Sequence, residues 1–164
     1  MTWTVRVLGI CLVLLMLGCA TGVSKQARSQ VTYYGSFAAL QTALDEHVGE
    51  VVMFGGKILR TKAYPNSSEI AVLQLPLGSG NRPQDGDHSE GRYLIRSEQF
   101  LDPAIYEQGR LLTVVGKLSG SEARSIGGFE YDYPVVEAIE LKPWPWARKA
   151  SPSFHFGIGV GTWF

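Results

Sequence analysis

An apolar run that ends in a cysteine constrains this chain most, because it decides which residues can belong to a fold. Val7 to Leu17 is an almost uninterrupted hydrophobic stretch, and Arg6 is the one charge before it. A membrane-spanning helix needs about 20 apolar residues, so the run is too short to cross a bilayer. Its length is typical of the hydrophobic region of a signal peptide. We therefore expect residues 1–18 to be a signal peptide that takes no part in the folded domain.

The end of the run predicts lipid attachment. Met16-Leu17-Gly18-Cys19 is similar to the bacterial lipobox, although Met16 stands where leucine is usual. Signal peptidase II cuts such a sequence before a cysteine that carries diacylglycerol. Two or more acyl chains anchor a protein stably, so Cys19 would hold the chain to a membrane. Ala20 follows where aspartate would retain the protein at the inner membrane, which favours the outer membrane. A plain secretory signal that is cut near Ala20-Thr21-Gly22 is the alternative.

The composition of the remaining 146 residues limits the function classes. Their length suits a single domain with a hydrophobic core. Loss of Arg6 leaves 14 basic against 15 acidic side chains, a net charge of about −1. There is no basic excess to neutralise phosphates, so we expect no nucleic-acid partner. Cys19 would be the one cysteine left, and a monomer could then form no disulfide.

Short β-branched runs separated by turn residues predict a mainly all-β fold. Residues 19–33 are small and polar, and we expect them to form a flexible tether. Ser36 is a candidate N-cap for one N-terminal helix over Phe37 to His47, which Gly49 would end. The Gly55-Gly56 pair predicts a bulge or sharp bend in the first strand. Five strands and a connection before the fourth favour a small OB-like barrel, with a β-sandwich as the alternative. The predicted strands are Glu50–Lys62, Glu69–Leu77, Arg92–Arg96, Leu111–Leu118 and Phe129–Leu141.

Several motifs within residues 34–142 resemble those of a known family. They include Gly55-Gly56-Lys57-Ile58, Gln74-Leu75-Pro76-Leu77, Ser89-Glu90-Gly91-Arg92-Tyr93, Phe100-Leu101-Asp102-Pro103, Thr113-Val114-Val115-Gly116 and Tyr131-Asp132-Tyr133-Pro134-Val135-Val136. In order and spacing they are similar to the Slp family, the starvation-inducible outer-membrane lipoproteins of gammaproteobacteria. The resemblance implies a lipid-anchored outer-membrane protein linked to stationary phase or stress. It implies no catalytic residues.

The polar loop before the third predicted strand holds the best candidate metal ligands. Asp85, Asp87 and Glu90 could offer oxygens to calcium, and His88 could bind a transition metal. Their spacing matches neither an EF-hand nor a zinc site. We favour a solvated acidic turn, and we expect no metal and no cofactor. No G-x-S-x-G motif is present, so we expect no enzyme.

Two pairs of side chains are candidates for ligand or partner contact. Tyr131 and Tyr133 alternate with Asp132, so both rings should lie on one face of the last strand. They could form a platform for a ligand, although a place in the barrel wall is the favoured interpretation. Arg92 and Arg110 could recognise an anionic lipid or glycan. Pairing of Arg92, Arg96 and Arg110 with Glu90, Asp102 or Glu107 is favoured instead.

Residues 143–164 are aromatic and rich in glycine, and they predict a C-terminal extended tail. Trp144 and Trp146 could contact a membrane interface, or the alternating apolar residues from Phe154 onward could add a strand to a partner's sheet. Packing of this strand on its own domain is an equal alternative.

Two functions of different class follow. The first is a non-catalytic envelope lipoprotein that docks a protein partner of the envelope through its tail. The second is a periplasm-facing OB-like module that binds a small ligand or a metal.

Overall fold

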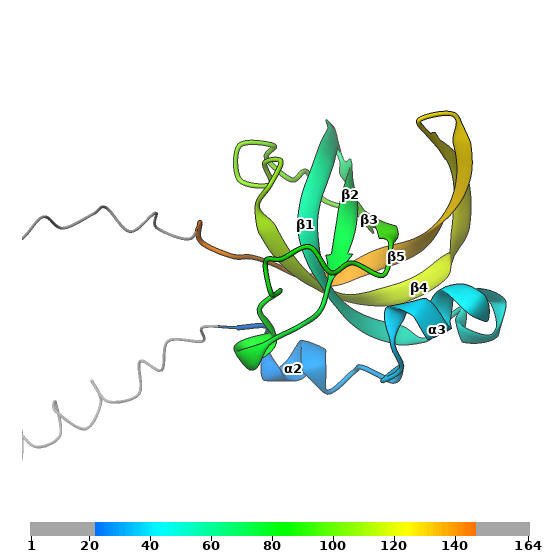
Figure 1. Cartoon of the computed structure of the whole chain (residues 1–164). Helices are drawn as coiled ribbons and strands as arrows, with labels where there is room; N and C mark the ends of the chain where they lie inside the picture. The colour runs from blue at the N-terminus through cyan, green and yellow to red at the C-terminus, as the bar shows by residue number, and fades with distance from the viewer. Residues whose placement is uncertain (1–21, 147–164) are drawn as a thin grey trace, which may run out of the picture.

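The computed structural model describes residues 22–146, which form a closed five-stranded barrel with short helices at its N-terminal side (Figure 1). Cys19 and residues 147–164 of the predicted tail lie outside this range. The elements are α2 (Lys25–Arg28), α3 (Phe37–Thr42), the 3₁₀ helix η1 (Leu44–His47), β1 (Val51–Tyr64), β2 (Ser67–Leu75), the 3₁₀ helix η2 (Ser79–Asn81), β3 (Arg92–Ser97), β4 (Leu111–Ile126) and β5 (Phe129–Pro143).

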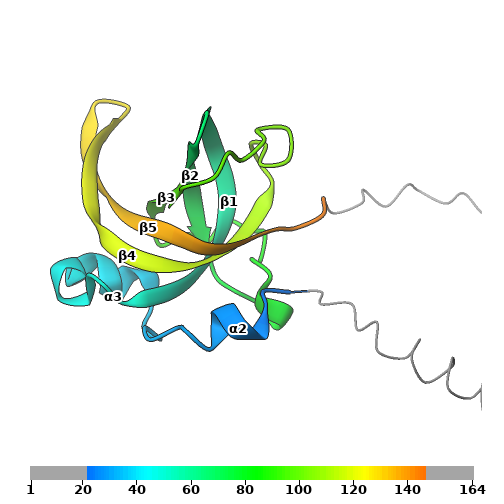
Figure 2. The same cartoon turned by 180° about the vertical axis from the view of Figure 1, so that it is seen from behind.

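The strand order confirms the predicted OB-like barrel. The strands follow one another as β1-β2-β3-β5-β4, and β4 returns to pair with β1. The pairing of β3 with β5 is parallel, and the other pairings are antiparallel. Each of the five predicted strands is present. The fourth continues to Ile126, well beyond the predicted end at Leu118, so that β4 and β5 extend as a long curved arm (Figures 1 and 2).

The hydrophobic core fills the barrel and extends under α3. Ser36 caps this helix as predicted, because its side chain accepts a hydrogen bond from the Ala39 amide. The helix ends earlier than predicted, since Ala43 leaves the helical conformation and separates α3 from η1. Phe37 points into the barrel, with its ring 5.1 Å from that of Phe54 and 5.7 Å from that of Tyr93. The helix thus covers one end of the barrel.

Two glycines allow neighbouring strands to approach closely. A Cβ on Gly56 would collide with the backbone carbonyl of Leu73 on β2, and one on Gly116 would collide with that of Glu137 on β5. The register shift in the β1–β2 pairing occurs between Ile58 and Arg60, not at the glycine pair where a bulge was predicted. Gly56 is therefore needed for close packing of the backbones.

The segment before α3 packs on the barrel. Residues 22–33 were predicted to belong to a flexible tether, but they include α2 and four buried side chains, those of Val23, Ala27, Val31 and Tyr33. Val23, Ala27 and Val31 contact Val115 on the outside of β4. Their four-residue spacing gives the segment an apolar side despite its polar composition, and burial of that side holds it in place.

Among residues 22–146, no helix has the length and apolar character that crossing a membrane requires.

Candidate functional site

A network of four charged side chains joins the β4–β5 arm to strands β2 and β3 of the barrel. Arg124 on the arm donates to both carboxylate oxygens of Glu69 on β2, at 2.8 and 2.6 Å, and to Glu122 at 2.7 Å. Arg96 on β3 pairs with Glu122 and lies 3.9 Å from Glu69. The two guanidinium groups are thus matched by two carboxylates, that of Glu69 on β2 and that of Glu122 on β4. The network borders the β2–β3 surface, the region through which OB folds commonly bind ligands.

Hydrogen bonding sets the protonation of this network. The bonds that Arg124 donates hold the pKa of Glu69 below its ordinary value, and they also lower the pKa of Glu122. The same bonds raise the pKa of Arg124. Both glutamates are therefore charged at neutral pH, and the network fixes the position of the arm.

A surface hollow of about 670 Å³ lies beside this network. It is formed by the β1–β2 hairpin, the end of β3 and the middle of β4 and β5. Its lining mixes charge with apolar surface and includes Tyr64, Arg96, Gln99, Lys117, Glu137 and Ile139. Such a lining suits a small amphipathic ligand that carries a polar group.

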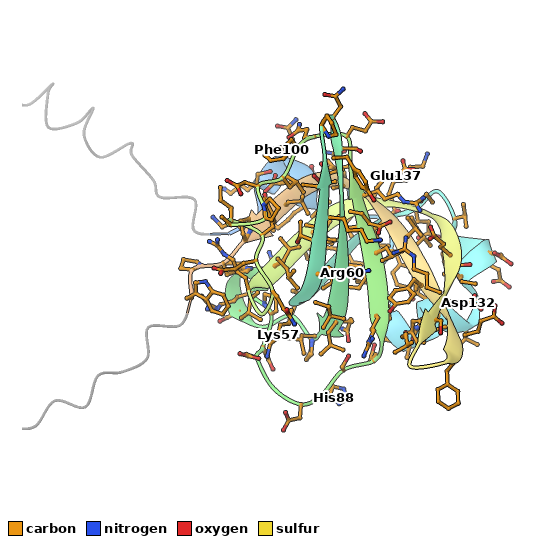
Figure 3. All side chains as sticks on the ribbon, turned by 90° about the horizontal axis from the view of Figure 1, so that it is seen from above. Lys57, Arg60, His88, Phe100, Asp132 and Glu137 are labelled. Carbon is orange, nitrogen blue, oxygen red and sulfur yellow. The ribbon has the colours of Figure 1, made fainter. Side chains whose placement is uncertain are left out.

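The predicted metal ligands do not converge. The Asp85 carboxylate pairs with the Lys57 ammonium at 2.5 Å, and Glu90 accepts a hydrogen bond from the Ala38 amide at 2.9 Å. His88 lies on the exposed loop that stands away from the strands (Figure 3). Within the described range 22–146, no three His, Cys, Asp or Glu side chains are placed to hold a metal ion together.

The two tyrosines lie together, as the alternation predicted. Their rings form an edge-to-face pair with centroids 4.9 Å apart, and Tyr133 is buried. The Tyr131 hydroxyl accepts hydrogen bonds from Gln41 at 2.7 Å and from the Arg92 amide at 2.8 Å. These bonds tie β5 to the start of β3 and to α3, so the Tyr131 hydroxyl has a structural role.

The arginines pair differently from the prediction. Arg96 pairs with Glu69 and Glu122, not with the acidic residues near the loops. The Arg110 guanidinium donates to two backbone carbonyls, that of Ile105 at 2.6 Å and that of Trp144 at 2.9 Å. Arg110 thereby connects the segment before β4 to the end of β5.

The two tryptophans at the end of the barrel have different environments. Trp144 is 7% exposed, and its indole N–H donates to the Thr113 hydroxyl at 2.9 Å. This packing overturns the prediction that Trp144 could contact a membrane interface. Trp146 is 52% exposed, and its indole N–H donates to Glu107 at 2.7 Å. Trp146 therefore remains available at the surface.

Sequence reasoning missed the Arg124 network and the anchoring of residues 22–31. The residues after Leu118 are mostly polar, so the predicted strand ended there, whereas β4 continues to Ile126. The alternation of Glu122 and Arg124 with small residues is a strand-like pattern that indicated the extension. The spacing of Val23, Ala27 and Val31 was the signal for the packed N-terminal segment.

The small closed barrel and its packed N-terminal segment define an OB-like domain. Comparison with known proteins identifies the family to which this domain belongs. The model of the outer membrane lipoprotein Slp family matches residues 16–162. The chain belongs to this family and is an outer-membrane lipoprotein.

Individual relatives agree with this assignment. The chain is 30% identical over 131 residues to the lipoprotein YeaY of Escherichia coli (strain K12). The aligned residues cover 80% of this chain and 67% of YeaY. It is 26% identical over 128 residues to the outer membrane protein Slp of the same strain, covering 76% and 68% of the two chains. A protein of Haemophilus influenzae is 35% identical over 96 residues, which is 58% of this chain and 52% of that protein.

Solved structures of low sequence identity include a small single-stranded DNA-binding protein from Streptomyces coelicolor, with a TM-score of 0.41 and 11% identity, covering 58% of this chain and 94% of that one. Another is Schizosaccharomyces pombe Pot1pC bound to single-stranded DNA, with a TM-score of 0.30 and 7% identity, covering 64% and 84%. Neither likeness bears on function.

Proposed function

We propose that this protein is a non-catalytic lipoprotein, anchored through Cys19, that docks a protein partner in the cell envelope under stress or in stationary phase. Membership of the outer-membrane lipoprotein family supports the anchoring. The setting in stress or stationary phase follows from the family resemblance.

The packing of the N-terminal segment is the observation that carries this proposal. Ser24 donates two hydrogen bonds to Glu140 on β5, one from its amide at 2.8 Å and one from its hydroxyl at 2.5 Å. A lipid on Cys19 would therefore be attached close to a fixed point on the barrel. The tip of the β4–β5 arm lies on the side away from the two described ends of the chain (Figures 1 and 2). This arrangement presents the arm to a partner.

An exposed aromatic residue marks the tip of the arm. Phe129 follows the Gly127-Gly128 turn and is 79% exposed. Aromatic side chains commonly anchor protein interfaces, because their burial removes a large apolar area from water. Phe129 is thus the contact that we propose for the described part of the chain, alongside the C-terminal tail.

The anchoring is tested in a gammaproteobacterial host by intact mass and membrane fractionation of the native chain and Cys19→Ala. We expect a triacylated product that starts at Cys19 in the outer membrane, and loss of both properties in the variant. An unmodified native product, or one in the inner membrane, would contradict the proposal.

Docking is tested by site-specific photo-crosslinking in intact cells, with the crosslinker at Phe129. The matched control carries it at Tyr34, which is also an exposed aromatic residue but lies before α3. We expect a discrete adduct of stoichiometric yield from position 129 only, and its loss in Cys19→Ala. Equal adducts from both positions would argue against a specific contact at the arm.

A second candidate function is the binding of a small ligand in the hollow beside Arg96. Its size and mixed lining favour this alternative. Thermal unfolding with a panel of small amphipathic anions tests it, with Lys117→Gln as the variant that should lose any stabilisation.

A further inference from the structure

The two described ends of the chain meet at one turn of the fold. A Cβ on Gly22 would lie 3.1 Å from the Gly80 carbonyl oxygen in this turn. The Arg82 guanidinium, at its end, donates to the Pro145 carbonyl at 3.3 Å. Gly22 and Pro145 thus flank the same segment, and Figures 1 and 2 show both ends leaving the barrel on one side.

The chain between this turn and the lipid is short. Two residues, Ala20 and Thr21, lie between Cys19 and Gly22, so the chain makes three Cα-to-Cα steps. An extended chain advances at most about 3.6 Å per residue, so Gly22 lies no more than about 11 Å from Cys19. Because Val23 and Ser24 are fixed on the barrel, this side of the domain must stay close to the membrane that holds the lipid.

The surface on this side has the chemistry of a membrane interface. The Ile105 and Trp146 side chains are 48% and 52% exposed. The Arg110 guanidinium donates to the Ile105 and Trp144 carbonyls and so holds the two segments that carry these side chains together. The cationic groups of Arg82 and Lys142 lie 5.4 and 5.8 Å from the centre of the Trp144 ring. We call Arg82, Ile105, Lys142 and Trp146 the anchor face. Tryptophan, aliphatic and basic side chains together favour the headgroup region of a bilayer.

Two carboxylates near the anchor face, those of Glu107 and Glu140, accept hydrogen bonds from groups within the protein. Glu107 accepts the indole N–H of Trp146 at 2.7 Å, and Glu140 accepts both hydrogen bonds from Ser24. Arg82 and Lys142 stack on an aromatic ring, so their charges remain available to lipid phosphates.

We propose that the anchor face lies on the phospholipid headgroups of the leaflet that holds the Cys19 lipid. Ile105 and Trp146 insert at the interface, and Arg82 and Lys142 contact lipid phosphates. The inference rests on the proposed lipidation of Cys19 and adds to it the orientation of the whole domain.

The test uses the acylated chain in vesicles of phosphatidylethanolamine and phosphatidylglycerol. With Cys11 removed and Cys19 acylated, a cysteine introduced as Ile105→Cys is the one free thiol and can carry a fluorophore. Lipids with a quencher on the headgroup report its distance from the membrane. We expect quenching at position 105 to exceed several-fold that at position 129, labelled through Phe129→Cys. Equal quenching at both positions in vesicle-bound, acylated protein would overturn the orientation and leave the proposed anchoring intact.

A charge variant tests the contact with phosphate. Lys142→Gln should lower the ratio of docked to undocked domain about five-fold, the factor that one cation near an anionic surface contributes. Lys62→Gln is the matched control, because Lys62 lies in the β1–β2 hairpin, where it pairs in register with Glu69. Equal effects of the two variants would overturn the contact assigned to Lys142. A chain without lipid on Cys19 would overturn the proposed function and this inference with it.

Discussion

Arg124 connects the outer arm of the barrel to β2, and its three charge-assisted hydrogen bonds make it a strong single-residue contact. Bidentate pairing with Glu69 fixes both groups, and the Glu69 side chain is only 14% exposed. Loss of the guanidinium would leave Glu69 partly buried with its main partner removed.

We therefore expect Arg124→Gln to lower the free energy of unfolding by about 1–2 kcal/mol, a value reduced by the partial exposure of the pair. Urea unfolding at pH 7 measures this loss. Arg60→Gln is the control, since Arg60 is an exposed arginine on β1 (Figure 3) and should change stability by less than about 0.5 kcal/mol. Equal losses in the two variants would show that the Arg124 contacts add nothing.

The same network predicts how stability depends on pH. The folded-state pKa values of Glu69 and Glu122 lie below their ordinary values because of Arg124. Their contribution is therefore fully present above the ordinary glutamate pKa of about 4.3 and is lost as the pH falls through the lower, folded-state values. Urea midpoints between pH 5 and pH 3 should fall less steeply in Glu69→Gln than in the native chain. Parallel pH profiles would contradict this assignment.

At the scale of elements, β1 depends on Gly56 for its approach to β2. We expect Gly56→Ala to destabilise the protein by about 1–3 kcal/mol, because the added Cβ would meet the Leu73 backbone and cannot be accommodated by a side-chain rotation. Thermal unfolding measures the effect. In the control, Gly86→Ala, the added Cβ meets no atom within 4 Å, so the two variants should differ clearly.

The elements also show which parts of the fold were predictable. Short β-branched runs between turn residues located all five strands, and Ser36 located the start of α3, because these signals lie within single segments. The Arg124–Glu69 bond and the packing of Val23 on Val115 join residues far apart in the sequence. Residues 22–33 were predicted to be a tether from their composition alone. Composition does not take account of the four-residue spacing of Val23, Ala27 and Val31, which was the signal for packing.

For the whole molecule, the charge balance predicts no binding to nucleic acid. The formal net charge is +0, and the arginines of the network, Arg96 on β3 and Arg124 on β4, are each paired with glutamates. Fluorescence anisotropy with a labelled single-stranded oligonucleotide at low salt should show no saturable binding. Binding that weakens steeply as salt is added would contradict this prediction, since it reports the release of counterions from phosphates.

Closure of the barrel has a consequence for a protein confined to a surface. Copies that carry a lipid diffuse in two dimensions, where they collide repeatedly in similar orientations. An open sheet would then offer unpaired backbone groups, and neighbouring copies could join edge to edge. In this barrel β3 pairs with β5 and β1 with β4, so within the closed wall each strand has a neighbour on both sides. Beyond the wall, the β4–β5 arm pairs only with itself from Glu122 to Tyr133. At high lateral density on a membrane, edge-to-edge joining of neighbouring copies would therefore be confined to the arm.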